Sequence, residues 1–181
     1  PSNPSPPTPE IEDIFWITVI NYPINLVFLT IISLGLIKFT GYGKSLTLPH
    51  ATYVRRLLIL SFVATIIGAI IDEIMVNKPF YDFTHSRYYP TYTPDFTVDS
   101  LLILTSLILI FMSFMILCIL ILKMSMKNSA IVGLSMAIIN AIFWYIAMDW
   151  GAGYILFMFF MFIPGSIITS LILLTLFTGK K

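Results

Sequence analysis

The chain has 181 residues, of which 58% are hydrophobic and only 10% are charged, and its mean hydropathy is +0.94. Soluble domains carry roughly 25% charged residues and about 45–50% apolar ones, so this composition excludes a soluble enzyme, a disordered chain and a nucleic-acid-binding protein. The single cysteine, Cys118, excludes a disulfide framework and a cysteine-based zinc or iron–sulfur site. The net charge of +1 is informative only through the positions of the charges.

Long apolar stretches separated by short polar segments predict an all-α, polytopic integral membrane bundle of five transmembrane helices, because a spanning helix needs about 20 mostly apolar residues. Together they form a single membrane domain. In chain order we expect a Pro-rich external tail at 1–9, helix 10–37, a cytoplasmic loop at 38–56, helix 57–76, an external aromatic loop at 77–93, helix 94–122, a cytoplasmic turn at 123–127, helix 128–148, an external turn at 149–153 and helix 154–179.

Basic and acidic residues separate onto opposite sides of these predicted helices. The side with 38–56, 123–127 and 180–181 has eight basic residues and no acidic one, whereas the other side has all nine acids with only Lys78 and Arg87. Cytoplasmic loops of membrane proteins carry an excess of Lys and Arg. We therefore expect the N-terminus outside, the C-terminus in the cytoplasm, and a multi-pass location in the cell (plasma) membrane.

Two predicted helices share a start signal. Segments 8–10 and 93–95 both place a threonine cap before a proline at the first helical position and an acid in the first turn. All three tryptophans fall near outer helix ends, where amphipathic rings favour the headgroup level. The alternative is that Trp16, Trp144 and Trp150 pack within the bundle.

Polar residues surround a proline in the first helix. Pro23 should kink this helix and free a carbonyl one turn earlier. The neighbouring amides Asn21 and Asn25, and Asn140 in the fourth helix, need hydrogen-bond partners within the membrane. Interhelical hydrogen bonds explain these buried amides better than a channel-like polar path through the membrane does.

Small residues and aromatic residues provide candidate interfaces. In the fourth helix, small side chains recur every four residues, which lets helix backbones approach closely; packing within the chain is the first interpretation and a subunit interface the second. The outer segment 77–99 holds seven aromatic residues, which should pack on the outer end of the bundle, on headgroups or on another subunit. The interface candidates are Gly133, Ala137, Ala141, Tyr88, Tyr89 and Tyr92.

Acidic residues mark the one region where chemistry is expected. Asp72 lies 16 residues beyond Arg56, about 24 Å along a helix and near the outer edge of the hydrocarbon core. Ionisable groups at such depth are candidates for function, although pairing with Arg87 or Lys78 would also satisfy them. Carboxylates with one imidazole suit manganese, iron or zinc. The candidate ligands of such an external metal site are Asp72, Glu73, Asp82, His85 and Asp149. They include one histidine, and the sequence has no HExxH motif.

Motifs for other chemistry are missing from the sequence. It has no paired histidines within spans for heme, no CxxC, no GxGD and no Gly-rich phosphate loop. We therefore expect no catalytic residues and no cofactor, with a metal ion at the external face as the alternative. The expected partners are the lipid bilayer and other membrane subunits, not nucleic acid.

Three functions fit these observations. The first is a small non-catalytic subunit of a larger membrane complex of energy-conversion or oxidase type. The second is a transporter or channel component with an outer carboxylate cluster, although five helices preclude two equal halves. The third is a membrane-embedded, metal-dependent oxidoreductase or monooxygenase subunit.

Overall fold

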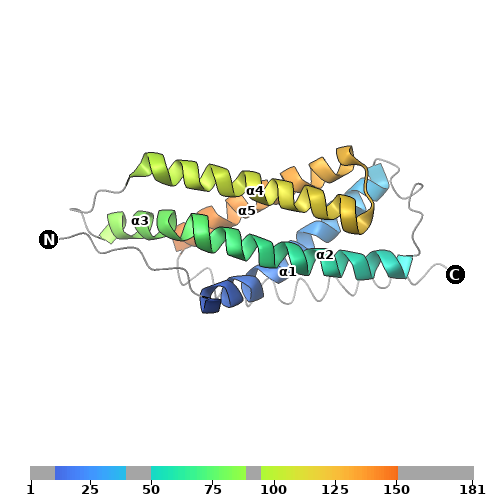
Figure 1. Cartoon of the computed structure of the whole chain (residues 1–181), viewed down its shortest axis with the longest axis horizontal. Helices are drawn as coiled ribbons and strands as arrows, with labels where there is room; N and C mark the ends of the chain where they lie inside the picture. Colours follow the sequence, from blue (N-terminus) through green and yellow to red (C-terminus); the bar gives the residue numbers. More distant parts are fainter. Residues whose placement is uncertain (1–10, 40–49, 89–94, 151–181) are drawn as a thin grey trace.

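The computed structural model describes residues 11–39, 50–88 and 95–150, and all regular structure in these ranges is helical. A short π-helical segment, η2 (Asp72–Val76), joins α2 to α3 without a break. Figure 1 shows α2, η2 and α3 as one long rod that runs beside α4, with α1 crossing this rod obliquely. Besides η2, the α-helices are α1 (Ile11–Phe39), α2 (His50–Ile71), α3 (Asn77–Tyr88), α4 (Phe96–Leu122) and α5 (Met126–Trp150).

Four helices of the described part are long and apolar enough to cross a membrane. This result confirms the all-α class and the membrane-type composition of the bundle. The predicted fifth helix, 154–179, lies outside the described residues, as does the tail at 1–9. Of the predicted turn at 149–153, the first two residues belong to α5 and the others lie outside the described residues. The four candidate spans are Ile11–Ser33, Thr52–Phe83, Phe96–Leu122 and Met126–Ala147.

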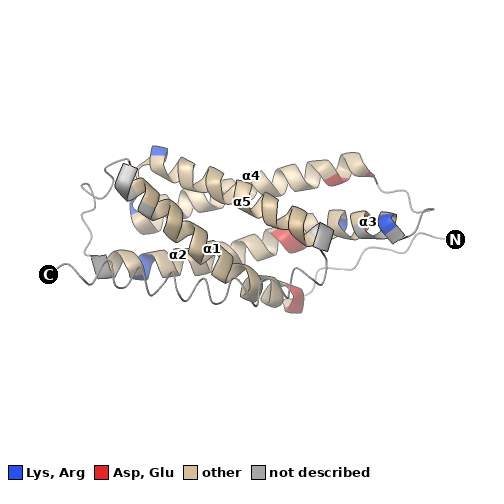
Figure 2. Ribbon diagram, turned by 180° about the vertical axis from the view of Figure 1, so that it is seen from behind, with Lys and Arg blue, Asp and Glu red and all other residues tan. Residues whose placement is uncertain are grey.

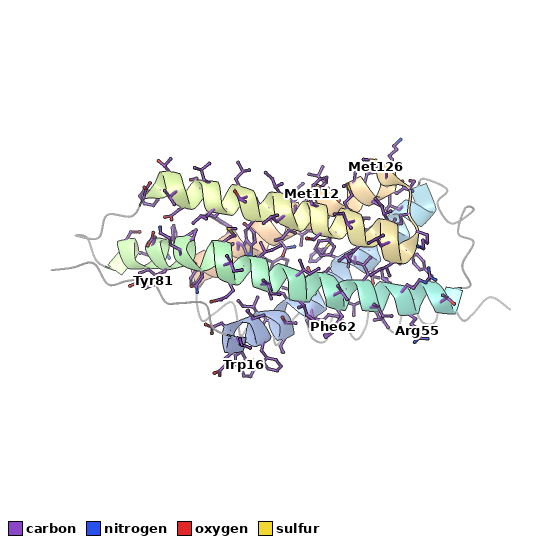
Figure 3. All side chains as sticks on the ribbon, viewed as in Figure 1. Trp16, Arg55, Phe62, Tyr81, Met112 and Met126 are labelled. Atoms are coloured by element: carbon purple, nitrogen blue, oxygen red, sulfur yellow. The ribbon has the colours of Figure 1, made fainter. Side chains whose placement is uncertain are left out.

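Large apolar side chains cover the outside of the bundle as well as its core. Figure 3 shows Phe62 and Met112 on the outer surface, where they are 51% and 39% exposed. Inside, Phe114, Leu60 and Met136 pack in one core with almost no exposed area. Water-facing surfaces of this kind would aggregate, so the distribution fits a bundle solvated by lipid.

The contact between α1 and α2 uses the polar residues near Pro23. Asn25 is buried and its Nδ2 donates to Thr65 Oγ1 at 3.0 Å, while Thr65 Oγ1 donates to the Ser61 carbonyl at 2.7 Å. The predicted interhelical hydrogen bond of Asn25 is thereby confirmed. Asn140 differs, because its amide donates to the Met136 carbonyl of its own helix at 2.8 Å.

Close packing joins α4 and α5 through the predicted small residues. A Cβ atom built on Gly133 would lie 2.6 Å from the Phe111 carbonyl oxygen, so only glycine permits this approach of the two backbones. Ala137 is buried in the same core, and Ala141 is half-buried. Gly133 and Ala137 are thus used within the chain, in agreement with the first interpretation of the stripe.

Charged side chains divide along the length of the described bundle. Figure 2 shows the Lys and Arg residues of α2, of α5 and of the turn between α4 and α5 at one end of the bundle. Most Asp and Glu residues lie toward the opposite end, together with Lys78 and Arg87 of α3. At the basic end, Arg56 Nη1 donates to the Ile121 carbonyl at 3.1 Å, which satisfies a free carbonyl in the last turn of α4. Arg56 therefore has a structural role besides its expected contribution to orientation.

Three predicted boundaries need correction. Residues 50–56 belong to α2 and not to a loop, and residues 77–88, expected as an aromatic loop, form α3. The start predicted with Thr93 as the cap is two residues too early, because Asp95 is the N-cap and α4 begins at Phe96. Asp95 Oδ1 accepts from the Thr97 and Val98 backbone amides at 3.1 and 3.2 Å, and a carboxylate in this position satisfies otherwise unpaired N–H groups.

Candidate functional site

A cavity of about 250 Å³ lies between α1, η2, α3 and α5. Four polar residues from three of these elements line it: Asn21 of α1, Asp72 and Glu73 of η2, and Asn77 of α3. Apolar and aromatic side chains make up the rest of the lining, so the cavity presents both polar and hydrophobic surface. These other lining residues are Ile17, Ile20, Val76, Phe80, Trp144 and Ala147.

The π-helical segment provides the two carboxylates of the cavity. The Asn77 N–H bonds to the Asp72 carbonyl, five residues earlier, instead of to a carbonyl four residues earlier. Such segments insert one extra residue into a helix and are frequent at functional sites. Here the consecutive residues Asp72 and Glu73 both reach the same cavity.

Both carboxylates are buried, but they are unequally satisfied. Glu73 is 4% exposed, and its Oε1 accepts a hydrogen bond from Asn77 Nδ2 at 2.8 Å. Asp72 is 8% exposed, and no group of the described residues donates to its Oδ1. Two side chains interact with the Asp72 carboxylate: the Trp144 indole acts as a hydrogen-bond donor to it, and the Glu73 carboxylate repels its negative charge. Neither of them supplies a positive charge.

A second acidic pair, Asp82 of α3 and Asp99 of α4, shares a basic partner. Lys78 Nζ contacts Asp82 Oδ2 at 2.6 Å and Asp99 Oδ1 at 2.9 Å. Both carboxylates are buried, whereas the Lys78 side chain is 39% exposed. This ion triad joins α3 to α4, which explains why the polar, aromatic segment 77–88 is held as a helix.

The structure divides the predicted metal ligands. Asp72 and Glu73 share the cavity, but Asp82 lies ten residues on, roughly 15 Å along the rod, and bonds to Lys78. His85 belongs to α3 and Asp149 to the last turn of α5, with side chains outside the described part. Within the residues that the structure describes, no three His, Cys, Asp or Glu side chains converge on one point.

The side chains of the three tyrosine candidates for an interface lie outside the described part of the chain. Tyr88 is the last residue of α3 and its side chain is not described, and Tyr89 and Tyr92 fall outside the described ranges. Trp16 is 51% exposed, as an interfacial residue should be, whereas Trp144 packs against the core and lines the cavity. Trp144 therefore follows the alternative of packing within the bundle.

Sequence reasoning missed Asp99, Trp144 and the pairing of Lys78. It proposed Lys78 as a partner of Asp72 or Glu73, whereas Lys78 bonds to Asp82 and Asp99. The four-residue spacing of Lys78 and Asp82 is a recognisable helical ion-pair signal, but it was hidden by the expectation of a loop. No local pattern points to Asp99 or Trp144, because tertiary packing brings them to their sites.

Fold and site together define a class: an all-α, multi-helix protein of the membrane-spanning type, with two buried carboxylates in a partly apolar cavity. Comparison with protein-family models, with curated proteins and with solved structures gives no significant match. Function must therefore be argued from the cavity itself.

Proposed function

We propose that the protein binds a cation in the cavity between α1, η2, α3 and α5, and that it acts as a transporter or channel component. The observation that carries the proposal is Asp72, a buried carboxylate that lines the cavity and whose Oδ1 accepts no hydrogen bond from the described residues. Ionisable residues within membrane segments are costly and are retained mainly where they act on ions or substrates.

The surroundings of Asp72 favour a bound cation over an internal ion pair. Among the described basic residues, Lys78 is committed to Asp82 and Asp99, and Arg56 to a backbone carbonyl of α4. No salt bridge in the described ranges includes Asp72 or Glu73. A cation that enters the cavity would supply the missing charge.

Cation flux through reconstituted protein tests this proposal. The full chain in liposomes should take up a cation, measured across protons, sodium, potassium and small ammonium ions, and Asp72→Asn should abolish uptake. Asp13→Asn is the matched control, since Asp13 is an exposed acid of α1, and it should leave uptake unchanged. Equal flux in Asp72→Asn and the unaltered protein, or no flux of any of these cations, would contradict the proposal.

We also propose that the acidic end faces outside the cell and the basic end the cytoplasm, in a five-helix plasma-membrane protein. The charge separation of the described residues supports this orientation. Cys118 is fully buried, so introduced cysteines can report accessibility. An impermeant maleimide should label Asp13→Cys in intact cells and Lys127→Cys only after permeabilisation; the reverse pattern would overturn the orientation.

The role of a non-catalytic subunit in a larger energy-conversion or oxidase complex remains a prediction, as does that of a metal-dependent oxidoreductase subunit. Purification in a gentle detergent tests the first: stoichiometric membrane partners should co-purify, and a monodisperse monomer would exclude it. Elemental analysis of the same preparation tests the second.

A further inference from the structure

We infer that the cation of this cavity is a small organic ammonium ion, a protonated amine with a short apolar body, and not a metal ion. This inference rests on the proposed cation-binding function and names the chemical class of the ligand. It follows from the walls of the cavity more than from its two acids.

The polar side of the cavity matches the donors of an ammonium group. An ammonium ion carries several N–H donors and no acceptor, and Asp72 Oδ1 is a buried acceptor that receives no donor from the described part of the chain. Glu73 lines the same space with one oxygen already bonded to the Asn77 amide. One ammonium group could therefore bond to Asp72 and lie near Glu73 without displacing an existing contact.

The apolar and aromatic lining of the cavity matches the body of an organic ion. Trp144 and Phe80 supply aromatic rings, and ring faces attract ammonium groups and bind apolar carbon equally well. Ile17, Ile20 and Val76 contribute aliphatic surface to the same cavity. A cavity of about 250 Å³ lies below the roughly 300–1,000 Å³ of pockets that hold drug-sized ligands, so it suits only a short organic body.

A metal ion fits these walls less well. Calcium takes 6–8 oxygen ligands and magnesium requires an octahedral set, whereas the described cavity offers two carboxylates, two amides and otherwise carbon. One of the amides, Asn77, already donates to Glu73. Dehydration of a metal ion would thus be poorly compensated, while an alkylammonium ion loses little hydration from its carbon side.

Calorimetric titration of the full chain in lipid nanodiscs tests the inference with n-butylammonium as the probe and 1-butanol as its uncharged counterpart of similar size. Butylammonium should bind saturably and about tenfold or more tightly than butanol, because only the ion pairs with the buried acid. Asp72→Asn should weaken butylammonium binding by about tenfold, and Trp144→Leu by about threefold. The control Asp13→Asn should bind like the unaltered protein.

Parallel titrations with sodium, potassium, calcium and manganese separate this inference from the function on which it rests. Binding of a metal ion that Asp72→Asn abolishes, without butylammonium binding, would overturn the ammonium assignment and leave the cation site standing. Absence of any Asp72-dependent cation binding would overturn both. Equal affinity for butanol and butylammonium would show a purely apolar cavity. Glu73→Gln, checked for a monodisperse elution profile, provides a second variant if Asp72→Asn fails to fold, and it should also weaken butylammonium binding.

Discussion

The described residues include two pairs of buried carboxylates, one within η2 and one between α3 and α4, and the pairs differ in whether a basic side chain bonds to them. Asp82 and Asp99 share the ammonium group of Lys78 at 2.6 and 2.9 Å. Asp72 and Glu73 face a cavity and form no salt bridge within the described ranges. A buried acid that is paired internally stabilises a helix contact, whereas one without a basic partner leaves a carboxyl oxygen available to a ligand.

This difference separates structure from function more clearly than burial does. All four carboxylates are buried to a similar degree, between 3% and 8% exposed, so exposure alone would group them together. The presence or absence of a basic partner distinguishes them. Removing the basic partner of Asp82 and Asp99 should therefore lower stability, whereas neutralising Asp72 should affect ligand binding.

Lys78→Met should have the largest effect on stability. It removes the ammonium group that Asp82 and Asp99 share, and breaking such pairs costs about 3–5 kcal/mol when both partners are buried. Because the Lys78 side chain is 39% exposed, we expect a smaller loss of about 2 kcal/mol in the free energy of unfolding. Reversible unfolding in mixed micelles of a mild detergent and dodecyl sulfate measures it.

The control for Lys78→Met is its combination with Asp82→Asn and Asp99→Asn. These amides remove the two negative charges that Lys78 balances, so the triple variant should regain about half of the lost stability or more. If it is as unstable as Lys78→Met alone, the packing of the lysine side chain and not its charge holds α3 against α4.

Gly133→Ala should have an intermediate effect and test whether loss of stability alone disturbs the cavity. The new Cβ would lie 2.6 Å from the Phe111 carbonyl oxygen, so the backbones of α4 and α5 must separate, at a cost of about 1–2 kcal/mol. Gly68→Ala is the matched control, because nothing lies within 4 Å of its Cβ position. Butylammonium affinity, measured beside unfolding, should be unchanged in both variants; equal stability of the two would contradict the close approach.

Asp72→Asn should have the smallest effect on stability, within about 0.5 kcal/mol of the unaltered protein or slightly above it, since it removes a buried charge that has no basic partner. The same unfolding measurement checks this expectation. A loss comparable to that of Lys78→Met would show that Asp72 holds the fold together, and the contrast between the two pairs would no longer stand.

The apolar pattern of the sequence was sufficient to predict the helical class and the approximate positions of the four described spans, because hydrophobic length determines where a chain can cross a bilayer. Local chemistry also predicted the bond of Asn25 to another helix and the use of Gly133 in helix packing. These features depend on residue type and spacing alone.

The segment 77–88 shows why the remainder was not predictable. Asn77, Pro79 and several aromatic residues are typical of a loop, and proline lacks the N–H that a continuing helix requires. The π-helical turn directly before it and the bond from Lys78 to Asp99 are tertiary effects that preserve the helix. The cavity likewise requires α1 and α5 to meet η2, and nothing in the local sequence encodes that meeting.

The length of the continuous rod of α2, η2 and α3 also has a consequence for imaging the protein. Its apolar span, Thr52–Phe83, has 32 residues and thus measures about 48 Å, well beyond a hydrocarbon core of about 30 Å. Unless it tilts steeply, this rod must emerge from the bilayer as a rigid post on the acidic side. A post of that kind would give a small membrane protein a recognisable landmark for electron microscopy, and an antibody fragment bound to its tip would mark the acidic end of the bundle.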